Sequence, residues 1–258
     1  MTWSQKRKLT YGFIFFFLLL GIIALIVVPI VTRAPSCADG KQNGDEKGID
    51  CGGSCVLYCP SEISPIIVLY ARSFPVTTST YNAVASIENQ NVRAITKEIS
   101  YIFKLYDKDN VLITERTGKT FIGSNSRSAI FEPALQVGNR IPVYTRFYFT
   151  STPVWLRATD DQMKTLVRVE NKKIESLETT PFVSAEIVNT SLATVSRTPV
   201  ITVVSDSNGN AIGASRTLVD ELPPDGTEEV FFTWQQPFAD QNVTVEIIPR
   251  INPFSIIW

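Results

Sequence analysis

Apolar and polar residues follow two different patterns along this chain of 258 residues. Residues 11–31 form an apolar run without a single charge. From Ile66 onward, apolar and polar positions alternate in short stretches that turn-forming residues separate. An apolar run of about 20 residues predicts a membrane-spanning helix, whereas alternation predicts half-buried strands. The pattern therefore divides the chain into a membrane segment and a β-rich region.

The apolar run is long enough to cross a bilayer as a helix. Three basic residues directly precede it: Lys6, Arg7 and Lys8. The positive-inside rule then places the N-terminus in the cytoplasm and the rest of the chain outside. The alternative is a cleaved signal peptide, but its apolar core is usually shorter, about 7–15 residues. We expect an uncleaved signal anchor, with a cytoplasmic tail in residues 1–10 and a transmembrane helix in residues 11–32.

The clearest alternation lies in residues 99–105, where every second residue is apolar. These residues share one face of the expected strand: Ile99, Tyr101, Phe103 and Leu105. Asp107 begins a turn, and residues 111–114 return as the partner strand. Regular short strands of this kind over about 90 residues predict a β-sandwich.

The second half of the chain repeats the first at a shift of about 100 residues. Residues 85–89 match residues 185–189, and the turn at Asp107 matches the turn at Asp206. A repeat of this length indicates two copies of one domain rather than a solenoid. The expected limits are 64–152 for the first sandwich, 153–162 for the linker and 163–258 for the second sandwich.

All four cysteines lie between the apolar run and the first expected strand: Cys37, Cys51, Cys55 and Cys59. Outside the cytoplasm they can form two disulfides, which would hold a small module with little apolar core. Three pairings are open. Zinc is the weaker alternative, because structural zinc sites usually use two close cysteine pairs and Cys37 stands alone. We place this disulfide module in residues 33–63.

The loop between Cys37 and Cys51 is rich in glycine and in oxygen ligands. Four of its residues are candidate calcium ligands: Asp39, Asn43, Asp45 and Asp50. Calcium takes six to eight oxygens from a flexible loop, although the spacing here is not that of an EF-hand. Asp, Asn and Gly also favour turns in a loop that binds nothing. Calcium is the one cofactor that the sequence suggests, and a plain turn-rich loop is the alternative.

Histidine is absent from the chain. This excludes Ser-His-Asp triads, Cys-His dyads and histidine-ligated metal sites built from this chain alone. Outside the expected tail, 21 basic and 25 acidic residues remain, a net charge of −4. Nucleic-acid binding requires a basic surface, so this balance argues against it. Adjacent acidic residues on a strand point to opposite faces, so their adjacency does not indicate a catalytic pair. We therefore expect no enzyme.

Residues 141–149 also alternate. One face carries an aromatic and basic stripe: Tyr144, Arg146 and Tyr148. The opposite face is expected to point into the core: Val143, Thr145, Phe147 and Phe149. Tyr and Arg are enriched in interfaces, so the stripe is a candidate partner surface. The alternatives are that these side chains merely cover the sheet, or that the second repeat packs there. The apolar residues 251–258 predict either a last strand or a segment that docks by strand addition.

Residues 103–107 read Phe-Lys-Leu-Tyr-Asp and resemble the F-x-L-Y-D motif of a family of small bacterial and archaeal envelope domains. Residues 87–91 are similar to the I-x-N-x-N strand end of those domains and of related desiccation-protein-like sandwiches. In the second repeat, residues 202–206 keep only the aspartate. The cysteine stretch, residues 37–59, resembles a short motif of bacterial surface and secreted proteins. These resemblances imply immunoglobulin-like sandwiches in the cell envelope, with no established reaction.

The chain is therefore expected to be mainly β, with an N-terminal transmembrane helix, a small disulfide-rich module and two tandem immunoglobulin-like β-sandwiches. The expected function is that of a non-enzymatic, single-pass protein of the bacterial cytoplasmic membrane. Its ectodomain would bind a protein partner or serve as an accessory subunit of an envelope complex. A calcium- or glycan-binding surface receptor is the alternative.

Overall fold

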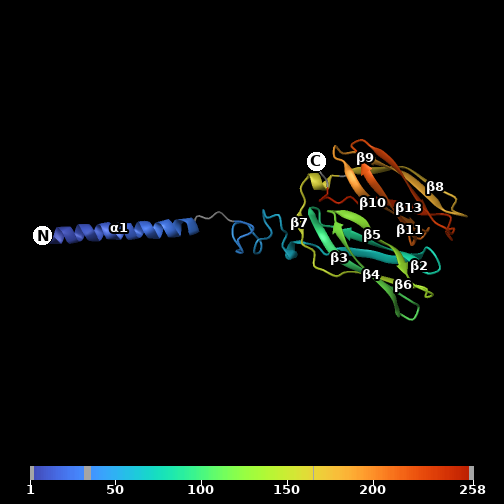
Figure 1. Ribbon diagram of the computed structural model, residues 1–258, viewed down its shortest axis with the longest axis horizontal. Coiled ribbons are helices and arrows are strands. Elements are labelled where there is room, and N and C mark those ends of the chain that lie inside the picture. The colour runs from blue at the N-terminus through green and yellow to red at the C-terminus, as the bar shows by residue number, and fades with distance from the viewer. Residues whose placement is uncertain (1–2, 32–35, 165, 256–258) are drawn as a thin grey trace. The chain divides into compact units, whose positions relative to one another are not determined.

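The computed structural model describes residues 3–31, 36–164 and 166–255. The chain forms two compact units, residues 1–55 and residues 56–258. The first unit contains one long helix and a disulfide-bonded loop, and the second contains every strand of the described residues (Figure 1).

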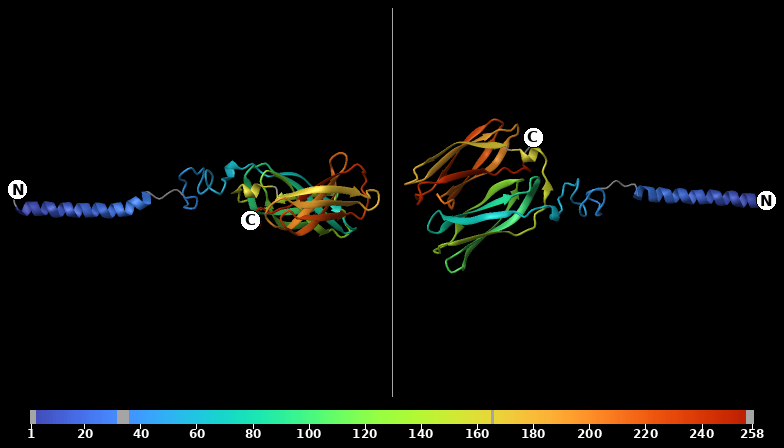
Figure 2. Two further views of the ribbon diagram at one scale, coloured as in Figure 1. Left: turned by 90° about the horizontal axis from the view of Figure 1, so that it is seen from above. Right: turned by 180° about the vertical axis from the view of Figure 1, so that it is seen from behind.

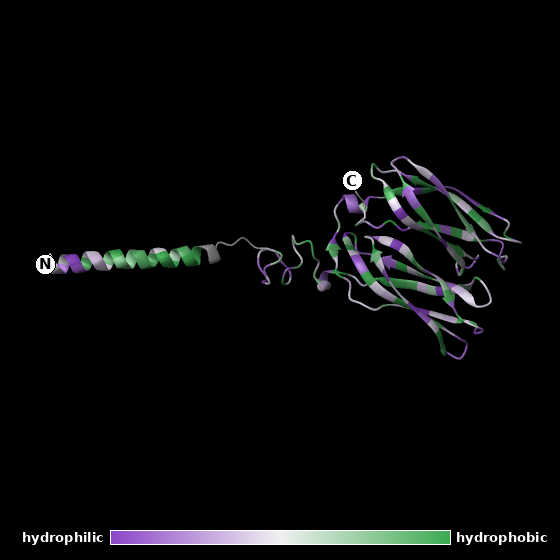
Figure 3. Cartoon of the chain, in the orientation of Figure 1, coloured by the Kyte–Doolittle hydropathy of each residue, from purple (hydrophilic) through white to green (hydrophobic). Residues whose placement is uncertain are grey.

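Helix α1 spans Trp3–Val31 and has 29 residues. At 1.5 Å per residue it is about 44 Å long. Its apolar side chains are exposed in the isolated chain, with Phe15 at 69% and Leu25 at 77%, and Figure 3 shows that apolar residues cover most of its length. Among the described residues it is the one helix long and apolar enough to span a membrane.

Residues 36–55 form a turn-rich loop that a disulfide closes. Cys37 and Cys55 are bonded, with their Cα atoms 5.6 Å apart. All four cysteines are disulfide-bonded and none is free, so the disulfide prediction is confirmed. Gly53 has a φ of +59°, and a Cβ at this position would lie 2.1 Å from the carbonyl oxygen of Asp45. The close approach of the two backbone segments therefore requires glycine.

Six strands build the first sandwich: β1 (Ile67–Pro75), β2 (Thr80–Asn89), β3 (Ala94–Tyr106), β4 (Leu112–Ile122), β5 (Ser126–Gln136) and β6 (Tyr144–Phe149). They form two antiparallel sheets, with strand orders β1-β2-β5 and β4-β3-β6. The alternation of β3 places its expected core face inside, since Ile99, Tyr101, Phe103 and Leu105 are all buried.

The second sandwich repeats this topology with six further strands: β8 (Val167–Glu175), β9 (Phe182–Asn189), β10 (Val195–Ser205), β11 (Ala211–Leu222), β12 (Thr227–Thr233) and β13 (Thr244–Pro249). Its sheets have the orders β8-β9-β12 and β11-β10-β13. Each strand of the first sandwich has a counterpart in the same place in the second. The prediction of a mainly β chain with two tandem sandwiches is therefore confirmed.

Short elements connect the two sandwiches and the preceding segment. Strand β7 (Leu156–Arg157) pairs with β3. The 3₁₀ turn η1 (Pro60–Glu62) precedes the first sandwich in the sequence, and η2 (Asp161–Met163) precedes the second. Leu57 also forms a bridge with Leu156. Residues 56–63, which we expected in the disulfide module, fall in the second unit, where Tyr58 and Ile63 pack against the core of the first sandwich. Cys59, in the same segment, is disulfide-bonded.

The same buried asparagine ends the second strand of each sandwich. Asn89 Nδ2 donates hydrogen bonds to the carbonyls of Ala94 (2.8 Å) and Gly123 (2.7 Å). Asn189 Nδ2 does the same to the carbonyls of Ala193, Leu222 and Pro223, at 2.8–3.0 Å. In both copies this side chain ties the end of one sheet to the connections of the other, which is the physical role of the repeated motif.

A third apolar cluster, separate from the two sandwich cores, joins the sandwiches to each other. The right-hand view of Figure 2 shows the two sandwiches lying side by side. The outer face of sheet β1-β2-β5 contributes Phe74, Val84, Ala129 and Phe131. The outer face of sheet β11-β10-β13 contributes Ile201, Val203, Ala211 and Ala214. The contact therefore joins two different sheets of the repeated fold, and it fixes the sandwiches in one compact unit.

Two details of the strand prediction are wrong. Strand β6 begins at Tyr144 instead of Ile141, and Val143 is 54% exposed instead of pointing into the core. The reason is that the partner strand β3 ends at Tyr106, which pairs with Tyr144, so no sheet lies beyond it. Of the two alternatives for residues 251–258, a last strand is not formed by residues 251–255, where Pro253 is buried; docking by strand addition stays a prediction, and residues 256–258 lie outside the described part.

Candidate functional site

The carboxylates of the acidic loop are engaged within the loop itself. Asp50 accepts hydrogen bonds from the backbone N–H groups of Asp39 and Gly40, at 2.9–3.1 Å. Asp39 Oδ2 accepts a bond from Asn43 Nδ2 (2.8 Å), and Asp45 Oδ1 accepts one from Ser54 Oγ (2.8 Å). These bonds account for the acidic residues as turn-forming groups. Calcium binding by this loop stays a prediction that a titration tests.

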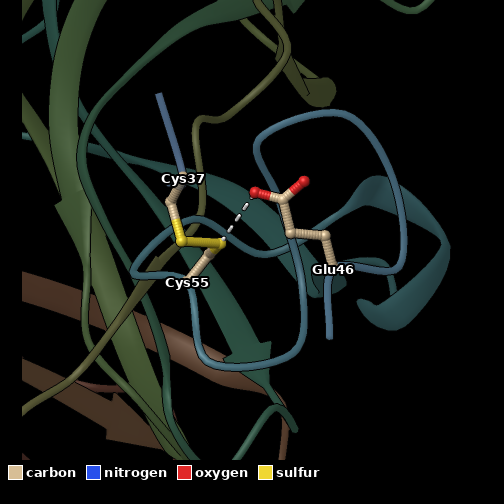
Figure 4. Close-up of side chains that lie close together, drawn as sticks. All are labelled: Cys37, Glu46 and Cys55. Atoms are coloured by element: carbon tan, nitrogen blue, oxygen red, sulfur yellow. Dashed lines mark hydrogen bonds between the residues drawn. A yellow bond between two sulfur atoms is a disulfide. The ribbon is translucent and has the colours of Figure 1, made fainter. Parts of the chain in front are cut away.

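Cys37, Glu46 and Cys55 bring their sulfur and carboxylate atoms within 4.8 Å of one another (Figure 4). Glu46 Oε1 lies 3.5 Å from Cys55 Sγ, along the dashed line of the figure. A disulfide sulfur carries no proton and is not a thiolate, so it is a poor donor to both the carboxylate and a metal ion. The other oxygen, Oε2, accepts a hydrogen bond from the backbone of Asn43 (3.1 Å). The cluster is therefore a structural part of the disulfide loop.

The aromatic and basic stripe of β6 lies on the surface. Tyr144 and Tyr148 are 47% and 46% exposed, and Arg146 is exposed between them, while Phe147 points into the core. The alternation of the strand thus separates the two faces as expected from Tyr144 onward. The second sandwich does not cover this stripe, because it packs on the outer face of the other sheet, β1-β2-β5.

Side chains of β3 and β4 extend this surface. Arg146 lies over the ring of Tyr106, 5.2 Å from its centroid, and this cation–π contact orients the guanidinium. Lys104 and Glu115 form an ion pair at 3.2 Å on the same outer face. We call this set the β6 surface: Lys104, Tyr106, Tyr144, Arg146 and Tyr148. It offers aromatic area together with the positive charges of Arg146 and Lys104, the second of which is paired with Glu115.

The F-x-L-Y-D residues have structural positions. Phe103 and Leu105 are fully buried in the first core. Asp107 Oδ1 accepts bonds from the backbone N–H groups of Asp109 (3.0 Å) and Val111 (2.8 Å), and its other oxygen pairs with Arg140. The Arg140 hydrogen bond, together with the two backbone bonds, holds the pKa of Asp107 below its usual range. Asp107 therefore acts as the anion that closes the β3–β4 turn.

One notable residue was missed in the sequence. Arg250 follows β13 and is only 7% exposed, at the junction of the two sandwiches. Its guanidinium donates to Thr120 Oγ1 (2.6 Å), to the carbonyl of Phe121 (3.0 Å) and to Ser128 Oγ. Burial lowers the pKa of Arg250 to about 10, so it stays charged at neutral pH. The signal in the sequence was a lone arginine within the apolar stretch 247–251.

Comparisons with known proteins add little. No protein-family model and no curated protein matches this chain. Red sea bream transglutaminase is similar in structure with a TM-score of 0.25 and 7% identity, over 74% of this chain and 30% of that one. A β-glucuronidase from glycoside hydrolase family 2 has a TM-score of 0.22 and 10% identity, over 67% and 23%. This chain thus spans less than a third of either protein, and likenesses this distant carry no argument about function.

Proposed function

We propose that this chain is a non-enzymatic, single-pass protein of the bacterial cytoplasmic membrane, with its N-terminus in the cytoplasm. Its two-sandwich body would bind a protein partner outside that membrane, or serve as an accessory subunit of an envelope complex. Membrane attachment raises the effective concentration of the body near its partners without any new contact.

The anchor rests on helix α1. The helix is apolar along the run 11–31 and has no acidic residue in its first turn. The basic residues at its start favour a cytoplasmic N-terminus. Water does not solvate so large an apolar surface well, and a lipid bilayer would cover it.

The observation that carries partner binding is the equivalence of two faces in the repeated fold. Tyr106 pairs with Tyr144 and Ile102 with Tyr148, just as Ser205 pairs with Thr244 and Ile201 with Ile248. The β6 surface thus occupies the place that Ile201 and Ile248 occupy in the second sandwich. In the second sandwich this face packs against protein, namely the first sandwich.

Two pairs of adjacent acidic residues also favour a binding role over catalysis. Asp160 pairs with Arg93 and Asp161 pairs with Lys164, both at 2.5 Å. Glu228 and Glu229 are adjacent on β12, where neighbours point to opposite faces. In each acidic pair the two carboxylates come from adjacent residues, whereas hydrolytic carboxylates face each other across a cleft.

The test is site-specific crosslinking in the native membrane. A photoreactive residue at position 148 should capture one protein partner. The control position is Leu218 on the second sandwich, because it is equally exposed at 46%. Tyr148→Ser and Arg146→Ser should each reduce the complex, whereas Phe231→Ser, on the exposed side of β12, should leave it unchanged. A full-length protein that migrates as a monomer in mild detergent and gives no crosslink at position 148 would overturn the proposal.

A further inference from the structure

A cavity of about 320 Å³ lies at the junction of the two sandwiches. The ends of β4 and β5 form its wall on the first sandwich, and β8 and the residues around Arg250 form its wall on the second. Small-molecule sites often lie between domains, with mainly apolar walls and a few polar groups. Phe121, Leu166, Val169 and Ile248 provide such apolar walls here.

The ionisable residues that line this cavity are all basic: Arg127, Lys164 and Arg250. No carboxylate is among the described residues of its lining. Lys164 is partly neutralised by Asp161, and Arg127, which is exposed, lies opposite Glu88 across the β2–β5 pair. Within the described part of the chain Arg250 has no such partner, and the described lining of the cavity therefore carries an excess of positive charge.

The environment of Arg250 is unusual for a buried arginine. Its hydrogen bonds run to two hydroxyls and one carbonyl, all neutral, and use three of its five N–H groups. Its guanidinium also stacks on the ring of Phe121, 4.6 Å from the centroid. No acidic side chain of the described residues forms an ion pair with it. A buried charge without a counter-ion is costly, so buried charges are usually paired.

We propose that the cavity binds a small anionic ligand that presents a carboxylate or phosphate group to Arg250 and Arg127. The planar guanidinium matches the two oxygens of such a group, and an oxyanion would supply the counter-charge that the described residues do not provide. The apolar walls would contact the uncharged part of an organic ligand. This site is distinct from the β6 surface and does not depend on the proposed partner.

The test is the thermal unfolding of the full-length protein in mild detergent with four solutes. Sodium phosphate and galacturonate carry the two oxyanions, galactose is the uncharged match of galacturonate, and sodium chloride controls for ionic strength. A ligand that binds only the folded state raises the melting temperature in a saturable way. We expect this rise with phosphate, galacturonate or both, and none with galactose or chloride. A rise with phosphate alone assigns the site to phosphate, and a larger rise with galacturonate assigns it to an organic acid.

Variants then locate the site by isothermal titration. Arg127→Gln, at an exposed position, should weaken binding of the effective anion about tenfold, because a charge-assisted hydrogen bond is lost. Arg250→Lys keeps the charge but loses the planar fork, and should also weaken binding. Lys108→Gln removes an exposed basic side chain in the β3–β4 turn, at the other end of β4 from the cavity, and should bind like the parent. Absence of any saturable oxyanion effect overturns the proposal, as does equal affinity in Arg127→Gln and Lys108→Gln.

Discussion

The buried Asn189 offers a sharp test of how the second sandwich is held together. Its side chain is fully buried, and Nδ2 donates to three backbone carbonyls. Its Oδ1 accepts bonds from the backbone N–H (3.0 Å) and the hydroxyl (2.8 Å) of Ser191. The change Asn189→Ala removes all of these bonds at once.

The magnitude follows from the groups that this change leaves unpaired. The carbonyl of Ala193 keeps a bond from Ser191 Oγ, and the carbonyl of Pro223 keeps one from the backbone N–H of Gly226, so the main losses are at Leu222 and the Ser191 N–H. Each buried polar group without a partner costs about 1–3 kcal/mol. For two such groups, of which water can reach the less buried one, we expect a loss of about 2–4 kcal/mol in the free energy of unfolding.

The assay is urea unfolding of the full-length protein in mild detergent, followed by tryptophan fluorescence. Asn208→Ala is the matched control, because Asn208 lies exposed in the β10–β11 turn and only its backbone is hydrogen-bonded there. The control should stay within about 0.5 kcal/mol of the parent. A loss below about 1 kcal/mol in Asn189→Ala, or one equal to the control, would refute the role that we assign to the repeated asparagine.

Four further outcomes are expected. Asp107→Asn should be less stable than the parent at neutral pH. The pKa of Asp107 is lowered in the folded state, so its contribution is present above 3.8 and lost below it, and the difference in urea midpoint should shrink as the pH falls below 3.8. Phe131→Ala, in the third apolar cluster between the sandwiches, should lower the free energy of unfolding by about 3–5 kcal/mol. Calorimetry should then show separate unfolding transitions for the two sandwiches. Reduction of the Cys37–Cys55 disulfide should raise hydrogen exchange in residues 36–55 and leave the strands protected; exchange throughout the strands would contradict the separate units. Calcium and a chelator should leave the melting temperature unchanged, because Asp50 is already hydrogen-bonded, and a saturable shift would favour the calcium hypothesis instead.

The strands and the duplication could be predicted from local sequence patterns. Period-two alternation placed Phe103 and Leu105 inside, and the match of Asn89 with Asn189 revealed the duplication. Such signals are local because neighbouring residues on one strand report the burial of its two faces. The exposed stripe of Tyr144, Arg146 and Tyr148 followed from the same alternation. The alternation failed only at Val143, where the partner strand ends.

The contact between the sandwiches and the Arg250 cavity could not be predicted in this way. Arg250 binds Thr120 and Ser128, which lie 130 and 122 residues away in the chain. No local periodicity reports which outer face will be covered by another domain. The departure of the second repeat from the F-x-L-Y-D motif was the hint: Lys104 is outward and charged, whereas its counterpart Val203 is buried in the contact.

The pairing of unlike sheets gives the duplicated body a direction. A two-fold pairing of the copies would use the same face of each, and both copies would then be left with the same free face. Here the first copy contributes one sheet and the second copy the other, as in a head-to-tail arrangement. The pair therefore ends in two different surfaces, the outer face of β4-β3-β6 and that of β8-β9-β12. Gene duplication followed by this kind of docking would let one end specialise while the other stays under separate selection.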